Sequence, residues 1–145
     1  MTTTFDVPAG VPRPLTTAAL DLLARCEDEL ITALRTDDVA ERYVHAHLAA
    51  LRAGAAVVAV HGRPARGRRT GGPRSVWEML PALDPALQEW ADRFAATAPA
   101  RAAVEAGRTG VVDAAAADDL LAHAEQFHRV VEATLGLSAL QPLAG

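Results

Sequence analysis

The sequence predicts an all-α protein that folds as one antiparallel bundle of about five helices. Apolar residues recur at alternating steps of three and four residues along several segments, which is the spacing of one face of an α-helix. Capping residues, prolines and glycines separate these segments, and no run of alternating β-branched residues indicates a strand. A chain of 145 residues fits one domain around one core. We therefore expect a single helical domain over residues 16–136.

The N-terminal part of the chain is expected to begin without regular structure. Residues 1–15 contain a stretch of prolines and glycines, and proline removes a hydrogen-bond donor and fixes φ, so we expect a flexible leader. Leucines at helical spacing follow it. They predict a first helix over about 17–35, with Thr16 or Thr17 as its N-cap.

A second helix is expected over about 38–60, because apolar side chains repeat there at steps of four and three residues. Asp37 or Asp38 can cap its first turn. Turn-forming residues without apolar periodicity then fill 62–74. We expect this segment to be an exposed loop between two helical halves.

Two sequence signals for the start of a helix follow the loop. Ser75 and, three residues later, Glu78 have the pattern of a capping box, which predicts a short third helix that ends near Pro81. The dipeptide Asp84-Pro85 places a cap before proline at the first helical position, and so predicts a fourth helix, bent near Pro99.

A fifth helix is predicted after Gly107 and Gly110, with Asp113 as its cap, a broad apolar stripe and an end at Gly136. Residues 137–145 remain as a C-terminal tail. Only 4% of the residues are aromatic, and helix faces lined with alanine bury little apolar area, each Å² contributing about 25 cal/mol. A homodimer would bury a further apolar face, and we expect one.

The composition and the N-terminus indicate a protein of the cell interior. No apolar run approaches the roughly 18 to 20 residues that span a bilayer, and the N-terminus lacks the basic start and apolar core of a secretory signal. Cys26 is the single cysteine, so an internal disulfide and a thiolate metal cluster are excluded. We expect a cytoplasmic protein without a membrane segment.

The five histidines are candidates for metal-binding or catalytic roles. His45 and His47 point about 200° from each other on a helix, and no Asp or Glu stands three or four residues from His47, so no metal site is expected. His47 and His128 fall on apolar helix faces and could meet, either as hydrogen-bonded core residues or as part of a site. His45 and His123 are most simply exposed to solvent.

A cluster of arginines between the second and third predicted helices is the strongest local electrostatic feature. Removing its five positive charges from the net charge of −4 leaves −9 on the rest of the chain, so a basic loop belongs to an otherwise acidic protein. Arginine forks pair with phosphate oxygens, so RNA, a nucleotide or another phosphate-bearing partner is one interpretation. A solvated linker is the other. The cluster consists of Arg63, Arg66, Arg68, Arg69 and Arg74.

The common catalytic and cofactor motifs are missing from the sequence. It has no Gly-x-Ser-x-Gly elbow and no Gly-x-Gly-x-x-Gly fingerprint, and the arginine cluster lacks the Lys-Ser/Thr ending of a nucleotide P-loop. Cys26 stands within a predicted helix without a neighbouring base. We therefore expect no cofactor.

Three segments carry a resemblance to a known family. They are AERYVHAHLAALRA at 40–53, PRSVWEML at 73–80 and ADDLLAHAEQFHRVVEA at 117–133. These segments resemble a small actinobacterial family of HEPN domains, a name that abbreviates higher-eukaryote-and-prokaryote nucleotide-binding. The resemblance covers nearly all of the chain after the leader. It implies an all-α bundle that often dimerises.

The resemblance also implies an activity. Many HEPN proteins are metal-independent ribonucleases, whose motif is an arginine followed a few residues later by a histidine, with the motifs of two subunits meeting across a dimer interface. Arg42 and His47 match that spacing. Histidine can act as general base or acid on the 2′-hydroxyl or the leaving oxygen, and arginine can stabilise charge on the phosphate. Three functions stay open: a module that contacts RNA or a nucleotide, a ribonuclease that uses Arg42 and His47, and a module that binds another protein.

Overall fold

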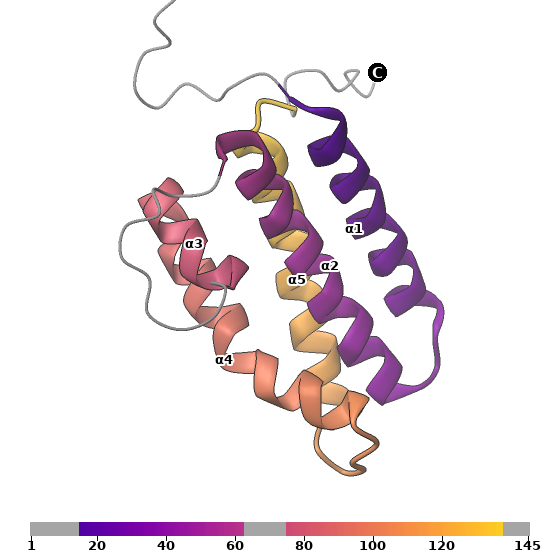
Figure 1. The fold of residues 1–145 in the computed structure, drawn as a ribbon. Coiled ribbons are helices and arrows are strands. Elements are labelled where there is room, and N and C mark those ends of the chain that lie inside the picture. The colour runs from indigo at the N-terminus through magenta and orange to yellow at the C-terminus, as the bar shows by residue number, and fades with distance from the viewer. Residues whose placement is uncertain (1–14, 63–74, 138–145) are drawn as a thin grey trace, which may run out of the picture.

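The computed structural model describes residues 15–62 and 75–137, which fold into a helical bundle (Figure 1). No strand occurs in these ranges, and the prediction of an all-α bundle of about five helices is confirmed. The predicted leader, exposed loop and C-terminal tail lie almost wholly outside the described residues. The helices are α1 (Thr17–Arg35), α2 (Val39–His61), α3 (Val76–Leu83), α4 (Gln88–Glu105) and α5 (Ala114–Thr134), with a 3-10 turn over Pro85–Leu87 before α4.

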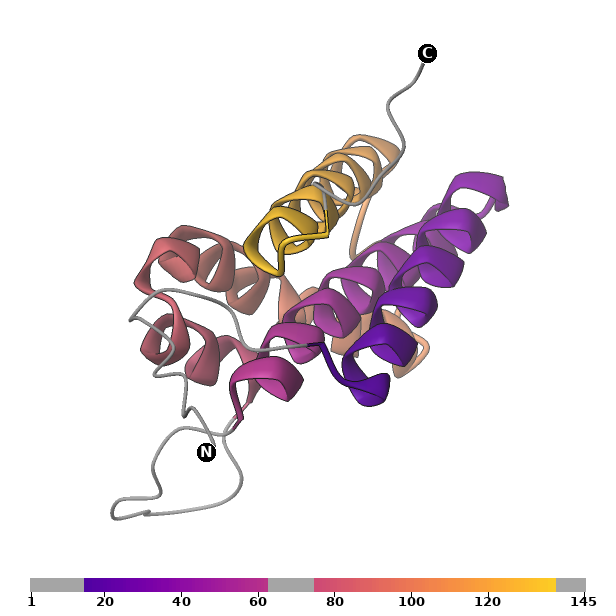
Figure 2. The same cartoon turned by 90° about the horizontal axis from the view of Figure 1, so that it is seen from above.

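α2 is the central helix of the bundle. It packs against α1, α3, α4 and α5, whereas α1 packs mainly against α2 and less extensively against α5. Figure 1 shows α1 and α2 as an antiparallel hairpin, with α5 running in the same direction as α2 and α4 in the opposite one. Seen from above, α2 lies between α1 and the pair formed by α3 and α4 (Figure 2).

The composition of α2 corrects one expectation. The helix is 23 residues long and apolar enough to cross a membrane by length and composition, although no such run was expected from the sequence. More than half of its most apolar stretch is buried inside the bundle. A helix with neighbours on several sides needs apolar side chains around most of its circumference. Its central position therefore accounts for its composition.

The helix starts follow the caps identified in the sequence. In α1, α2, α3 and α5, a side-chain oxygen of the cap accepts a hydrogen bond from a backbone N–H of the first turn. At α3 the capping box is complete, because the Glu78 carboxylate also accepts from the Ser75 N–H. α3 continues to Leu83, past the predicted end at Pro81. The four caps are Thr16, Asp38, Ser75 and Asp113.

A cluster of aromatic rings forms the largest part of the core between α3, α4 and α5. Neighbouring rings of Trp77, Trp90, Phe94 and Phe127 lie with their centroids 5.2–6.3 Å from one another or from His47. His47 of α2 presents its ring edge-on to this cluster. The chain has few aromatic residues, but their large side chains pack together here and bury much apolar area.

Small residues let α2 approach its neighbours closely. Alanines line its buried face, and a Cβ added at Gly54 would stand 2.8 Å from Cγ1 of Val76 and 3.3 Å from the Trp77 ring. Such a contact is too short for carbon atoms, so α3 could not remain at this distance with a larger residue there. α4 contains Pro99 and changes direction along its length (Figure 1), consistent with the predicted bend.

Candidate functional site

Arg42, one residue of the ribonuclease motif inferred from the sequence, ties α2 to α1 and α5. Its Nε and Nη2 donate to the carbonyl oxygens of Ala33 and Thr36 at the end of α1, over 3.3 and 2.8 Å. Its Nη1 lies 2.8 Å from Oδ1 of Asp118 on α5. The last carbonyls of a helix lack intrahelical donors. The guanidinium therefore caps α1 while it pairs with α5.

His47, the other residue of that motif, lies in the core. Its side chain is fully buried, and Nε2 is 2.9 Å from the Phe94 carbonyl oxygen, so Nε2 carries a proton and donates. Burial lowers the pKa of His47 below its ordinary 6.5; the bond to Phe94 opposes this shift, and the charge of Arg101 adds to it. The interpretation of His47 as a hydrogen-bonded core histidine is confirmed.

Arg42 and His47 point to different sides of α2. Five residues turn an α-helix by about 140°, and accordingly Arg42 contacts α1 and α5 while His47 contacts α3 and α4. Within the described part of one chain the structure does not bring the two side chains together. Their joint role in cleavage across two subunits stays a prediction.

The arginine cluster that the sequence suggests for phosphate binding lies outside the described residues. Its role therefore also stays a prediction. The five positions concerned are Arg63, Arg66, Arg68, Arg69 and Arg74.

A pocket of about 360 Å³ opens between α2, α4 and α5, and several polar side chains line it. On one side, Nη1 of Arg93 lies 2.9 Å from Nε2 of His123. Because a guanidinium can only donate, His123 accepts through Nε2 and is neutral, with its proton on Nδ1. Tyr43, Thr97 and Asp119 also line the pocket, together with alanine and leucine side chains. We call it the Arg93–His123 pocket.

The electrostatic field in this pocket is positive at His123. Burial lowers the pKa of His123 below 6.5, the charge of Arg93 lowers it further, and Asp119 opposes these effects more weakly. The Arg93 guanidinium also lies over the Trp90 ring, 5.7 Å from its centroid. A guanidinium has several N–H donors, and among the described residues His123 takes only one of them. The pocket therefore contains a fixed, positively charged guanidinium whose other N–H groups can donate hydrogen bonds to a ligand.

Two histidines that were expected in solvent have partners instead. His123 accepts from Arg93 as described, and His45 Nδ1 is 2.6 Å from Oε1 of Glu29, with Arg52 also near that carboxylate. Arg93 and His123 stand 30 residues apart on different helices. No local spacing in the sequence could have revealed that pair.

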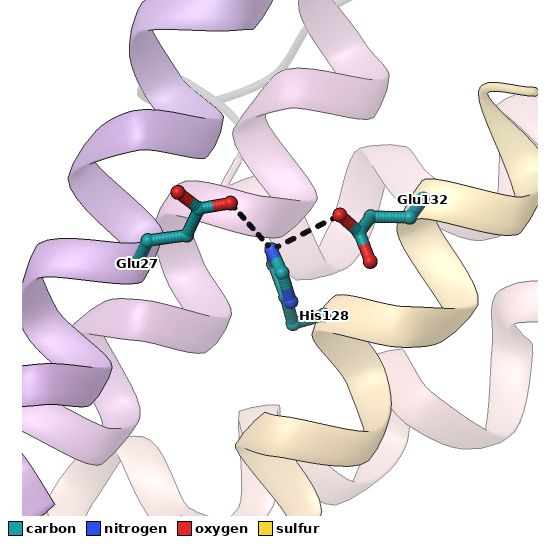
Figure 3. Close-up of side chains that lie close together, drawn as sticks. All are labelled: Glu27, His128 and Glu132. Carbon is teal, nitrogen blue, oxygen red and sulfur yellow. Dashed lines mark ion pairs between the residues drawn. The ribbon is translucent and has the colours of Figure 1, made fainter. Parts of the chain in front are cut away.

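A second cluster lies between α1 and α5 and consists of Glu27, His128 and Glu132 (Figure 3). Nε2 of His128 is 3.5 Å from Oε2 of Glu27 and 3.8 Å from Oε2 of Glu132. His128 therefore faces α1 and does not meet His47, which contacts α3 and α4. The spacing of four residues between His128 and Glu132 was visible in the sequence, whereas Glu27 joins them only in the fold. No metal site was expected, but these residues present three ligand atoms within 4.8 Å of one another.

Comparison with known proteins identifies a family. The model of a HEPN family matches residues 33–132, a range that includes α2, α3 and α4 and nearly all of α5. No curated protein and no solved structure matches the chain. The family match spans more than half of the sequence and the central helices of the bundle, and it confirms the resemblance found in the sequence. The chain belongs to the HEPN family.

Proposed function

We propose that this HEPN domain is a homodimeric module that contacts RNA or another phosphate-bearing ligand, and that a phosphate group binds in the Arg93–His123 pocket. The observation that carries the proposal is the guanidinium of Arg93, which is held by Trp90 and His123 at the wall of a pocket. A planar guanidinium matches two phosphate oxygens at once. His123 is neutral and therefore does not compensate this positive charge.

Loss of Arg93 tests the pocket. We expect Arg93→Gln to weaken binding of a short fluorescent single-stranded RNA about tenfold or more, because a hydrogen bond to a charged group contributes about 1.5–3 kcal/mol. Fluorescence anisotropy at fixed salt measures this affinity. Arg108→Gln is the matched control, since Arg108 is also exposed and its loss changes the net charge equally. Equal effects of the two substitutions would assign the binding to net charge alone.

The arginine cluster is proposed as a second, electrostatic contact. Neutralising Arg66, Arg68 and Arg69 together should weaken RNA binding and also flatten its dependence on salt, because each phosphate that an arginine neutralises releases condensed counterions. The slope of log affinity against log salt should fall by about 0.7 for each phosphate of a single strand that is no longer neutralised. An unchanged slope would show that the cluster does not contact RNA.

Dimerisation is proposed through the outer face of α1. Leu20, Ile31 and Leu34 lie on one side of this helix and are 48, 44 and 58% exposed, and few other large apolar side chains in the described ranges are exposed as much. A second copy of the chain would cover this face symmetrically. Light scattering should give a dimer for the wild type and a monomer for Leu34→Glu, while Val111→Glu, away from α1, should stay dimeric. A wild-type monomer would instead leave the face to another protein.

The ribonuclease alternative has its own test. RNA cleavage in EDTA is compared for the wild type, His47→Gln and His123→Gln. If His47 acts in the cleavage step, its replacement abolishes activity. If cleavage persists in His47→Gln but is lost in His123→Gln, the cleavage site lies in the Arg93–His123 pocket. The absence of cleavage by the wild type would rule out the ribonuclease alternative.

A further inference from the structure

Glu27, His128 and Glu132 bring three possible metal-ligand atoms within 4.8 Å of one another. The His128 ring is 14% exposed, and its Nε2 is wholly buried without a hydrogen-bond partner among the described residues. Two carboxylates face this nitrogen from α1 and α5 (Figure 3). A buried imidazole nitrogen between two carboxylates is satisfied either by a proton that it donates to them or by a cation bound among the three groups.

We propose that Glu27, His128 and Glu132 bind one divalent transition-metal ion, with Zn²⁺ as the reference, and that this ion links α1 to α5. The inference is independent of the proposed contact with phosphate. Imidazole nitrogen and carboxylate oxygen are ligands that such ions prefer. Two carboxylates also balance the charge of a divalent ion, so its burial leaves no net charge on the site.

The distances fit this ion closely. Tetrahedral Zn²⁺ holds nitrogen and oxygen ligands at about 2.0–2.2 Å, so that neighbouring ligand atoms stand about 3.3–3.6 Å apart. The two separations from His128 Nε2 are 3.5 and 3.8 Å. The separation from Glu27 already lies within this range, and the separation from Glu132 exceeds it by about 0.2 Å. His128 and Glu132 are one turn apart on α5, so the helix itself fixes their relative position.

The neighbouring Cys26 does not complete the ligand set, because the group of close ligand atoms comes from Glu27, His128 and Glu132. Three protein ligands then leave a fourth position for water, as in zinc sites that are not closed by protein.

A second pair of histidine and glutamate provides the matched control. His45 and Glu29 also join α2 to α1, but they offer one carboxylate instead of two, and Arg52 places a positive charge beside it. A guanidinium repels a metal ion. His45→Gln should therefore leave metal binding unchanged, although it removes a histidine just as His128→Gln does.

Calorimetric titration of the metal-free full-length protein with Zn²⁺ tests the proposal. We expect one ion per chain for the wild type and His45→Gln, with binding at least about tenfold weaker in Glu27→Gln and His128→Gln. Glu27 is exposed, so its variant tests the site without disturbing the core. The Co²⁺ form of the wild type should also show a ligand-field absorption that Glu27→Gln diminishes.

Thermal unfolding gives an independent measurement. Saturating Zn²⁺ should raise the Tm of the wild type and of His45→Gln by several degrees, because the ion binds the folded chain alone, and should not raise that of His128→Gln. The absence of saturable Zn²⁺ uptake by the wild type would overturn the proposal. So would equal affinity in the wild type, Glu27→Gln and His128→Gln, which would place the ion elsewhere.

Discussion

His47 and Arg42 illustrate how single side chains on one helix can serve opposite sides of a bundle. Arg42 supplies donors to the open end of α1 and a charge to α5, and His47 supplies one donor to a carbonyl of α4. A carbonyl left without a donor in the interior costs free energy, so both side chains contribute to stability whatever else they do. Their structural roles predict distinct effects of substitution.

The unfolding free energy should depend on pH through His47. Its pKa is lowered in the folded chain, so as the pH falls below 6.5 the unfolded chain takes up a proton that the folded chain does not. This contribution to stability is present above pH 6.5 and is lost below it. His47→Gln keeps a donor for the Phe94 carbonyl and does not titrate. Urea unfolding at several pH values between about 7.5 and 5 should therefore show the wild type losing stability relative to this variant, and parallel profiles would contradict the assignment.

Replacement of Arg42 should cost more than replacement of its ion-pair partner. Arg42→Ala removes two hydrogen bonds to carbonyls of α1, and we expect a loss of about 1.5–3 kcal/mol in the unfolding free energy. Asp118 is 63% exposed, so Asp118→Ala should cost less than about 1 kcal/mol. Chemical denaturation measures both values. Equal losses would mean that the ion pair, and not the capping of α1, is what Arg42 contributes.

At the scale of elements, the helix boundaries were predictable because capping chemistry is local. Asp38 and Ser75 accept hydrogen bonds from N–H groups only three residues away, so the sequence alone carries the signal. The pairing of elements was not predictable in this way. Arg93 meets His123, and Glu27 meets His128, across helices that only tertiary packing brings together. Periodicity identifies the apolar face of each helix, but not which helix covers it.

The capping box of α3 gives a prediction at this scale. Ser75→Ala removes the side-chain acceptor of the Glu78 N–H, which keeps only its bond to the Ser75 carbonyl oxygen, and should lower the unfolding free energy by about 1 kcal/mol. Ser75→Asp supplies a carboxylate oxygen in the same place and should retain most of the stability. Urea denaturation of the three proteins checks this order. If Ser75→Ala were as stable as the wild type, the box would not hold the start of α3.

For the whole molecule, the central position of α2 has several consequences. Because α2 is central, its small residues allow close helix contacts, Arg42 and His47 face different neighbouring helices, and Tyr43 lines the Arg93–His123 pocket. The central position of α2 also explains why this helix has the apolar composition of a membrane span although it lies inside a bundle. α1, with neighbours on fewer sides, is left with the exposed apolar face proposed for dimerisation.

The claim that a phosphate-bearing ligand enters the Arg93–His123 pocket is tested most directly by NMR. A ¹⁵N-labelled sample is titrated with a short single-stranded RNA, and the backbone amide shifts are followed residue by residue. We expect saturable shifts at Thr97, Asp119 and His123 around the pocket, and little change on the outer face of α1. Saturable binding that leaves the pocket amides unmoved, or no binding at all, would contradict the proposed function.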